Sequence, residues 1–156
     1  MNWIIRSTKT VKYHTNLQEV LKPIWEVLKE YNWVLTDLDF ISDTEVPINF
    51  DHDYFILNHD EFEKVYNSET QIIWGIISAV PRSHEINLSL ISKFSAENEK
   101  VWKPDQFLIP ESFLEIIAFD SGYTIVKFRN KDMSNKFKNH FGREALSLKK
   151  FNEKYK

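Results

Sequence analysis

The amino-acid sequence predicts an α+β fold, in which two or three helices pack on a mixed, mainly antiparallel sheet. The longest apolar run, TQIIWGIISAVP at residues 70–81, is rich in β-branched side chains and is typical of a central strand covered on both faces; a buried helix is the rival interpretation. Gly75 within this run indicates a bulge or a close backbone approach. Apolar residues recur at helical spacing near 16–31 and at 131–141. A length of 156 residues suits one domain, 1–156, with its own core.

Composition excludes several classes of protein. The chain contains no cysteine, so disulfides, cysteine nucleophiles and cysteine-based zinc sites are absent. No apolar run approaches the roughly 20 residues that cross a bilayer, and the N-terminus MNWIIRSTKT lacks the apolar core and cleavage site of a signal peptide. We therefore expect a cytoplasmic protein that has no membrane segment and needs no cofactor.

Local signals place the other elements of the first half. Thr15-Asn16-Leu17-Gln18 has the pattern of a capping box, and Pro23 should kink the following helix or split it in two. Asn58 or Asp60 can cap a short helix over 61–66. The strands expected in this half are 2–7, 33–41 and 54–57, with a polar loop at 42–53.

In the second half of the chain, the secondary-structure signals of the sequence are weak at first and clear afterwards. After Pro81, residues 85–91 fit a strand, 92–104 fit a loop, and Pro110 can open a helical turn. Asn130 or Asp132 can cap the 131–141 helix, which Gly142 should end. The remaining expected elements are a hairpin of strands 114–119 and 123–128, and a last strand at 145–148 or a frayed helix in 143–156.

Charge is distributed unevenly along the chain. Between Glu30 and Glu63 there are ten acidic residues and no lysine or arginine, whereas Tyr123 to Lys156 holds ten basic residues and three acidic ones. The two segments carry −10 and +7, and they largely cancel in a net charge of −3. One interpretation is that the two segments face each other in the fold or are simply solvated. The other is that the acidic span forms a surface that docks a basic partner.

A docking surface would use carboxylates for steering and aromatic rings as apolar anchors. Alternation along a strand at 33–41 puts Asp37 and Asp39 on the face of Trp33, Leu35 and Ile41. These two carboxylates should then either reach solvent or find buried partners such as Arg129 or Lys127. The predicted partner-binding residues are Asp37, Asp39, Phe40, Asp43, Glu45, Asp51, Asp53 and Tyr54.

Two alternatives use other chemistry. Asp51-His52-Asp53 and Asn58-His59-Asp60 supply oxygen and nitrogen ligands, which suggests a metal-dependent hydrolase at an Asp51–Asp60 cluster. The spacing of these ligands matches neither an EF-hand nor a helical zinc site.

The basic C-terminal third, which interleaves lysines with aromatic residues, suggests nucleic-acid binding. A pI near 6 is unlike that of a nucleic-acid binder. The sequence also contains no phosphate loop, dinucleotide-binding motif or nucleophile elbow.

The aromatic, acidic stretch WVLTDLDFISDTEVPINFDHDYF at residues 33–55, in a small cysteine-free α+β chain without a catalytic motif, resembles the immunity proteins of bacterial polymorphic and contact-dependent toxin systems. The resemblance implies a non-enzymatic protein that binds one cognate toxin domain, often a basic nuclease, and blocks its active site. It rests on the character of the whole chain, so it assigns no role to any single residue.

Overall fold

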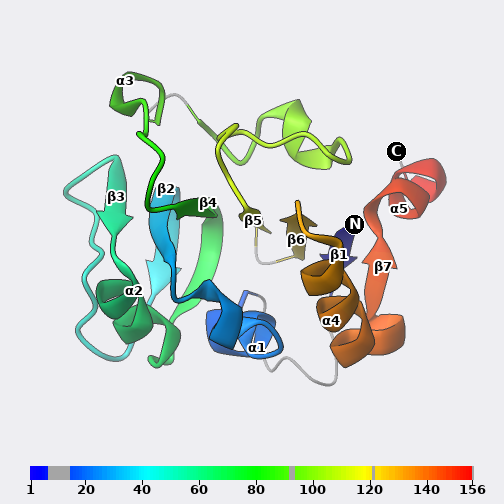
Figure 1. Ribbon diagram of the computed structural model, residues 1–156, viewed down its shortest axis with the longest axis horizontal. Helices are drawn as coiled ribbons and strands as arrows, with labels where there is room; N and C mark the ends of the chain where they lie inside the picture. The colour runs from blue at the N-terminus through cyan, green and yellow to red at the C-terminus, as the bar shows by residue number, and fades with distance from the viewer. Residues whose placement is uncertain (7–14, 92–93, 121, 156) are drawn as a thin grey trace.

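One antiparallel sheet of seven strands runs across the whole molecule (Figure 1). The structure is a computed structural model that describes residues 1–6, 15–91, 94–120 and 122–155. The strand order is β3-β2-β4-β5-β6-β1-β7, and every neighbouring pair is antiparallel. The α+β prediction is confirmed. The strands are β1 (Asn2–Ile5), β2 (Tyr31–Ile41), β3 (Tyr54–Leu57), β4 (Gln71–Pro81), β5 (Leu114–Phe119), β6 (Tyr123–Phe128) and β7 (Ala145–Ser147).

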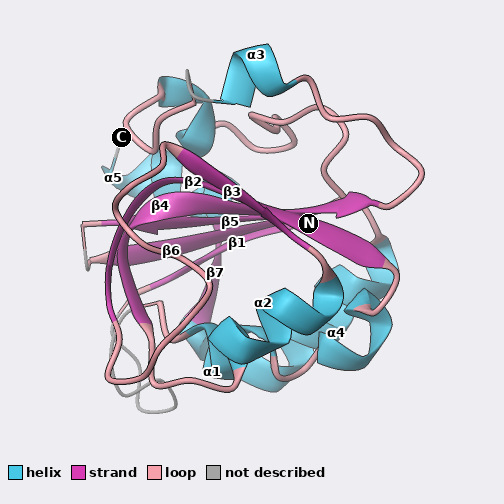
Figure 2. Ribbon diagram, turned by 90° about the vertical axis from the view of Figure 1, so that its left-hand side faces the viewer, coloured by secondary structure: helices cyan, strands magenta, loops and turns pink. Residues whose placement is uncertain are grey.

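Both faces of the sheet are covered (Figure 2). Four helices lie on one face, and the main core forms between them and the sheet. The chain between β4 and β5 lies on the other face together with the C-terminal helix, over two smaller apolar clusters. On the first face are α1 (Leu17–Leu21), the 3₁₀ helix η1 (Trp25–Leu28), α2 (His59–Tyr66) and α4 (Lys131–Phe141); on the second are α3 (Leu88–Ile91), η2 (Glu99–Trp102) and α5 (Leu148–Tyr155).

Strand β4 is interior and buried on both faces, as the 70–81 run predicts. Ile77 and Ala79 belong to the main core under the helices, whereas Ile76 and Val80 belong to the clusters on the opposite face. The middle position of the sheet is occupied by β5, so β4 has two strands on one side and four on the other.

A bulge in β2 reverses the alternation that the sequence predicts. The pairing of β2 with β4 shifts between Thr36 and Asp39, and Asp37 adopts φ = 56°. Trp33 and Leu35 pack in the main core before the bulge, but Leu38 and Phe40 pack against it afterwards. The prediction that Asp37 and Asp39 share a face with Trp33 and Leu35 is therefore wrong.

Gly75 lies opposite this bulge, in agreement with the close approach that its position predicts. Its φ is 149°, a region that disfavours other residues, and a Cβ atom there would lie 2.7 Å from Cδ2 of Leu38. A side chain at this position would strain the backbone and force the end of the Leu38 side chain to shift, so glycine suits the close approach of β4 to the bulge.

Several local predictions need correction. Pro23 does split the first helix, between α1 and η1, but the N-cap is Asn16, whose side chain accepts a hydrogen bond from the Glu19 N–H. The strand expected at 85–91 is wrong, because its end forms α3. Pro110 opens no helical turn before β5. After Gly142, the end of the chain forms both a strand, β7, and a helix, α5. Ser7, the expected end of the first strand, lies outside the described residues.

Candidate functional site

The sheet order separates the acidic span from the basic C-terminal third. The acidic residues lie on or beside β2, β3 and α2, at one end of the sheet, and the basic residues lie on or beside β6, β7, α4 and α5, toward the other end (Figure 1). Strands β4 and β5 stand between β2 and β6. The two charged segments therefore do not face each other, and the acidic span is not neutralised by the basic third.

Five of the predicted binding carboxylates are exposed at this end of the sheet. Their side chains form no hydrogen bond or ion pair with any residue that the structure describes. Such hydrated carboxylates are available to pair with a cation. We call this set the acidic edge; it consists of Asp39, Asp43, Glu45, Asp51 and Asp53.

Asp37 has internal partners, which is one of the two predicted alternatives, but they are not the predicted ones. Its Oδ2 accepts hydrogen bonds from Nε1 of Trp74 at 2.8 Å, from the Ala96 N–H at 2.9 Å and from Oγ of Ser95 at 3.1 Å. The left-handed conformation of Asp37 turns its carboxylate toward these donors, and aspartate tolerates this conformation better than most residues. Asp37 therefore fastens the segment after α3 to the bulge of β2, and neither Arg129 nor Lys127 is its partner.

The loop at 42–53 is ordered by local contacts and presents one aromatic ring to solvent. Ile48 is buried in the main core and anchors the loop. The side chain of Asn49 accepts a hydrogen bond from the Asp51 N–H, which fixes the turn at its tip. Phe50, between Asn49 and Asp51, is 67% exposed and stacks on Phe40 at a ring-centroid distance of 4.7 Å. The loop thus holds Phe50 outward, beside Asp51 in the chain and at pockets that Glu45 and Asp53 also line.

The two predicted apolar anchors are less exposed than other apolar side chains at this end of the sheet. Phe40 and Tyr54 are only half exposed, because Phe40 packs against the main core and Tyr54 packs on the opposite face of the sheet. Phe50 and Ile41, 67% and 61% exposed, are the most exposed large apolar side chains in this part of the described chain. The position of Phe50 between polar residues in a predicted loop was the signal that could have identified it.

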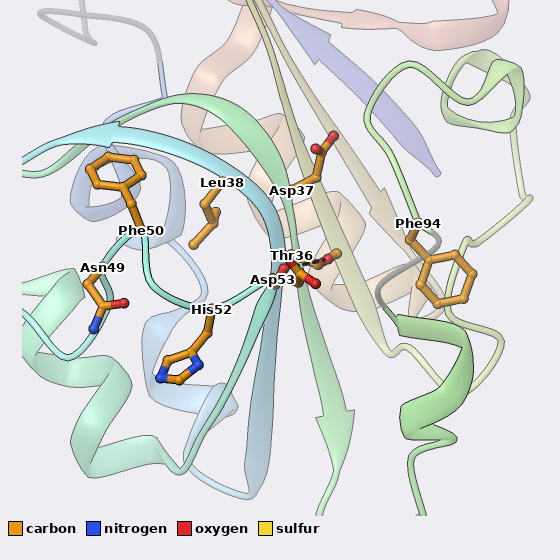
Figure 3. A pocket seen from close by; sticks show the side chains of 8 residues that line it. All are labelled: Thr36, Asp37, Leu38, Asn49, Phe50, His52, Asp53 and Phe94. Atoms are coloured by element: carbon orange, nitrogen blue, oxygen red, sulfur yellow. Dashed lines mark hydrogen bonds between the residues drawn. The ribbon is translucent and has the colours of Figure 1, made fainter.

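A pocket of about 340 Å³ lies between this loop and the segment after α3 (Figure 3). Phe50 and His52 come from the loop, Phe94 comes from the other side, and the bulge of β2 lies between them. Asp37 lines the pocket, but its carboxylate points away from His52 (Figure 3). Asp53 and Phe50 therefore bring a free carboxylate and an aromatic ring to one pocket, a combination whose chemistry suits a lysine or arginine side chain.

The Asp51–Asp60 cluster is not assembled as a metal site. Asp51-His52-Asp53 precedes β3 and Asn58-His59-Asp60 follows it, so the strand keeps the two groups apart. His59 is buried against Trp25, with ring centroids 4.8 Å apart, and its Nε2 lies 3.8 Å from a Glu63 carboxylate oxygen. Across the part of the chain that the structure describes, no three His, Asp or Glu side chains are grouped closely enough to hold a metal ion.

Several basic side chains of the C-terminal third make structural hydrogen bonds to backbone carbonyl groups. Arg129 donates to the carbonyls of Ser112 and Pro110, and Lys138 donates to those of Gly142 and Ala145. The aromatic residues proposed for stacking on bases are mostly interior: Phe128, Phe137, Phe141 and Phe151 are buried. The lysines that remain exposed are therefore not interleaved with exposed phenylalanines in the way that single-strand binding uses.

Two buried charges face each other across β5 and β6. Glu115 and Lys127 are directly opposite in the pairing of these strands. Oε2 of Glu115 accepts from the N–H groups of Leu108 and Ile109 at 2.9 and 3.4 Å. Nζ of Lys127 donates to three carbonyl oxygens of the segment between α3 and β5, at 2.7–3.1 Å: those of Lys100, Lys103 and Gln106. The pair thus holds this segment on the sheet.

Burial perturbs both groups of the pair. Desolvation raises the pKa of Glu115 from 4.5 to about 7, although Lys127 and the two backbone N–H groups act to lower it. Desolvation also lowers the pKa of Lys127 from 10.5 to about 8, against the opposite effects of Glu115 and Asp105. The Glu115 carboxylate and the Lys127 ammonium are therefore both largely charged only between about pH 7 and 8.

These shifts predict the pH dependence of stability. Because the pKa of Glu115 is higher in the folded state, its stabilising effect is complete below pH 4.5 and is lost as the pH rises to about 7. Because the pKa of Lys127 is lower in the folded state, its effect is complete above pH 10.5 and is lost as the pH falls to about 8. The pair should reduce the free energy of unfolding most between about pH 7 and 8.

The measurement is urea unfolding of the parent and of Glu115→Gln at pH 4.5 and pH 7. Relative to the variant, the parent should lose about 2–3 kcal/mol over this interval, since one pKa unit corresponds to about 1.4 kcal/mol. Parallel pH profiles of the two proteins would contradict the assignment of this titration to Glu115.

Within the described part of the chain, no helix is long and apolar enough to cross a membrane. Comparison of the chain with protein-family models, with curated proteins and with solved structures finds no match.

Proposed function

We propose that this is a non-enzymatic binding protein whose acidic edge docks a basic protein partner, and specifically an immunity protein that neutralises a toxin domain in the cytoplasm. One observation carries the proposal: five exposed carboxylates without partners among the described residues lie on the loop at 42–53 or at the adjoining end of β2, and the same loop exposes Phe50. A buried aromatic anchor with a polar rim is the usual arrangement of an interface hot spot.

The two kinds of side chain would contribute differently to binding. The acidic edge accelerates encounter with a basic surface, and this effect weakens as salt screens the charges. Phe50 provides apolar area that becomes buried in the complex and therefore slows dissociation. Because the Asn49–Asp51 turn and Ile48 already hold the loop in place, little ordering entropy is lost when the partner docks.

Substitutions should separate these contributions. Phe50→Ala should weaken binding by about 2 kcal/mol or more, a factor of about 30 in Kd, chiefly through faster dissociation. Asp39→Lys should slow association about tenfold at low salt and leave the dissociation rate nearly unchanged. Glu153→Lys is the matched control, since it changes the net charge equally at an exposed position on α5, beyond β7. Stopped-flow or surface-based kinetics at two salt concentrations would measure both rates.

Where the gene immediately upstream encodes a large secreted protein, the C-terminal domain of that protein is the partner to test first. Co-expression of the parent chain should protect cells from this domain, and Phe50→Ala combined with Asp39→Lys should abolish protection while the melting temperature changes little. If the purified domain binds the double variant as tightly as the parent, the acidic edge is not the docking surface. Absence of both binding and protection would remove the immunity function.

A further inference from the structure

The two terminal strands of the sheet are both open. Among the described residues β3 pairs only with β2, and β7 pairs only with β1. One edge of each strand therefore presents backbone N–H and C=O groups that have no strand partner, although the Ala145 carbonyl of β7 accepts a hydrogen bond from Nζ of Lys138. Each strand also exposes an apolar side chain, Ile56 (38%) on β3 and Leu146 (41%) on β7.

The charges beside these strands are opposite in sign. β3 is preceded by Asp51 and Asp53 and followed by Asp60, all exposed. β7 is followed at once by Lys149 and Lys150, which are exposed in the first turn of α5.

Arg143, also exposed, precedes β7. Its neighbour Glu144 is half-buried and also takes part in an interaction. One end of the sheet is thus negative and the other positive, with five strands between β3 and β7 (Figure 1).

We propose that copies of this chain associate head to tail, with the β7 edge of one copy adding to the β3 edge of the next. Strand addition would satisfy the open backbone groups, and Ile56 and Leu146 would be partly buried at the junction. Pairing of two β3 edges, or of two β7 edges, would bring like charges together, so the symmetric contacts are disfavoured. A head-to-tail contact that does not close into a ring produces an open chain of subunits.

The association should be weak and sensitive to salt. The strands contribute only four and three residues, so the buried area is small and the charges carry much of the specificity. The inference uses the acidic edge but does not rest on the proposed function. A basic partner bound at this edge would compete with the second copy and shorten the chains.

Sedimentation velocity of the purified chain tests the proposal. At an ionic strength of about 0.01 M, where the screening length is about 30 Å, the weight-average sedimentation coefficient should rise steadily with protein concentration. At about 1 M, where the screening length is about 3 Å, this rise should disappear. Asp51→Asn/Asp53→Asn and Lys149→Gln/Lys150→Gln neutralise one end each, and each variant should associate at least tenfold more weakly with itself.

Mixing the two variants distinguishes head-to-tail association from other modes. Each variant keeps one intact end, so an equimolar mixture should form dimers and nothing larger. Circular dichroism and melting temperature verify that both variants fold. A parent that stays monomeric at every concentration, or a single-end variant that associates as strongly as the parent, would overturn the proposal. Neither result affects binding of a basic partner, which is measured separately.

Discussion

Replacing Lys127 by methionine should destabilise the protein by about 3–5 kcal/mol at pH 8, the largest effect that we expect from any single substitution. The variant removes the only cation opposite Glu115 in the pairing of β5 with β6. It also leaves the carbonyl oxygens of Lys100, Lys103 and Gln106 without the ammonium that they share. Methionine fills similar volume, so the loss arises from charge and hydrogen bonding and not from a cavity.

The pH dependence and a second substitution identify the cause. At pH 5 the loss should be smaller, because Glu115 is then protonated in the folded state and its charge needs no compensation. Glu115→Gln/Lys127→Met should recover part of the stability at pH 8, since both buried charges are gone. Urea unfolding of the four proteins forms a double-mutant cycle. A loss below about 1 kcal/mol at pH 8, or no recovery in the double variant, would contradict this account of the pair.

The second large effect is expected at Asp37, where alanine should cost about 3 kcal/mol. The N–H of Ala96, which is buried, and the indole N–H of Trp74 would both lose their acceptor. Alanine is also disfavoured at φ = 56°, which adds strain of about 1 kcal/mol. Besides lower overall stability, we expect faster hydrogen exchange of the Ala96 amide, because this hydrogen bond fastens its segment to β2.

Two controls separate the role of Asp37 from that of a surface carboxylate. Asp37→Asn keeps the tolerated backbone conformation and one acceptor oxygen, so it should cost less than alanine. Asp39→Ala, two residues along the same strand, should change stability by no more than about 0.5 kcal/mol, since Asp39 is exposed and has no described partner. Equal losses for Asp37→Ala and Asp39→Ala would show that the contacts of Asp37 contribute little.

These two predictions bear on function as well as stability. Lys127, Glu115 and Asp37 together hold the segment between α3 and β5 on the sheet. The Asp37 contact lies beside the pocket that Phe50 and Phe94 share. Charge reversal at Asp37 would therefore disturb folding near the acidic edge, whereas Asp39 reports on binding alone. Tests of the docking surface should use Asp39 and Phe50 and leave Asp37 intact.

The sequence by itself determined most of the secondary structure. The β-branched run of β4, the strand of residues 54–57 and the hairpin of β5 and β6 are local patterns, and the structure contains each of them. Asn58 and Asn130, each one of two predicted candidates, cap their helices, and the sequence could indicate them because a cap depends on hydrogen bonds three residues along the chain. The sequence also localised the acidic span, since charge along the chain needs no fold to be counted.

Only the tertiary structure decided which side chains of that span are available. A bulge opposite Gly75 reversed the face of β2 after Thr36, and this turned Asp37 toward internal donors while Asp39 remained in solvent. The sheet order decided that the acidic and basic segments lie apart, because pairing between distant strands is not encoded in any local period. Burial of Ile48 and stacking on Phe40 decided that Phe50 is the exposed ring, since both contacts join the loop to residues that only folding brings near.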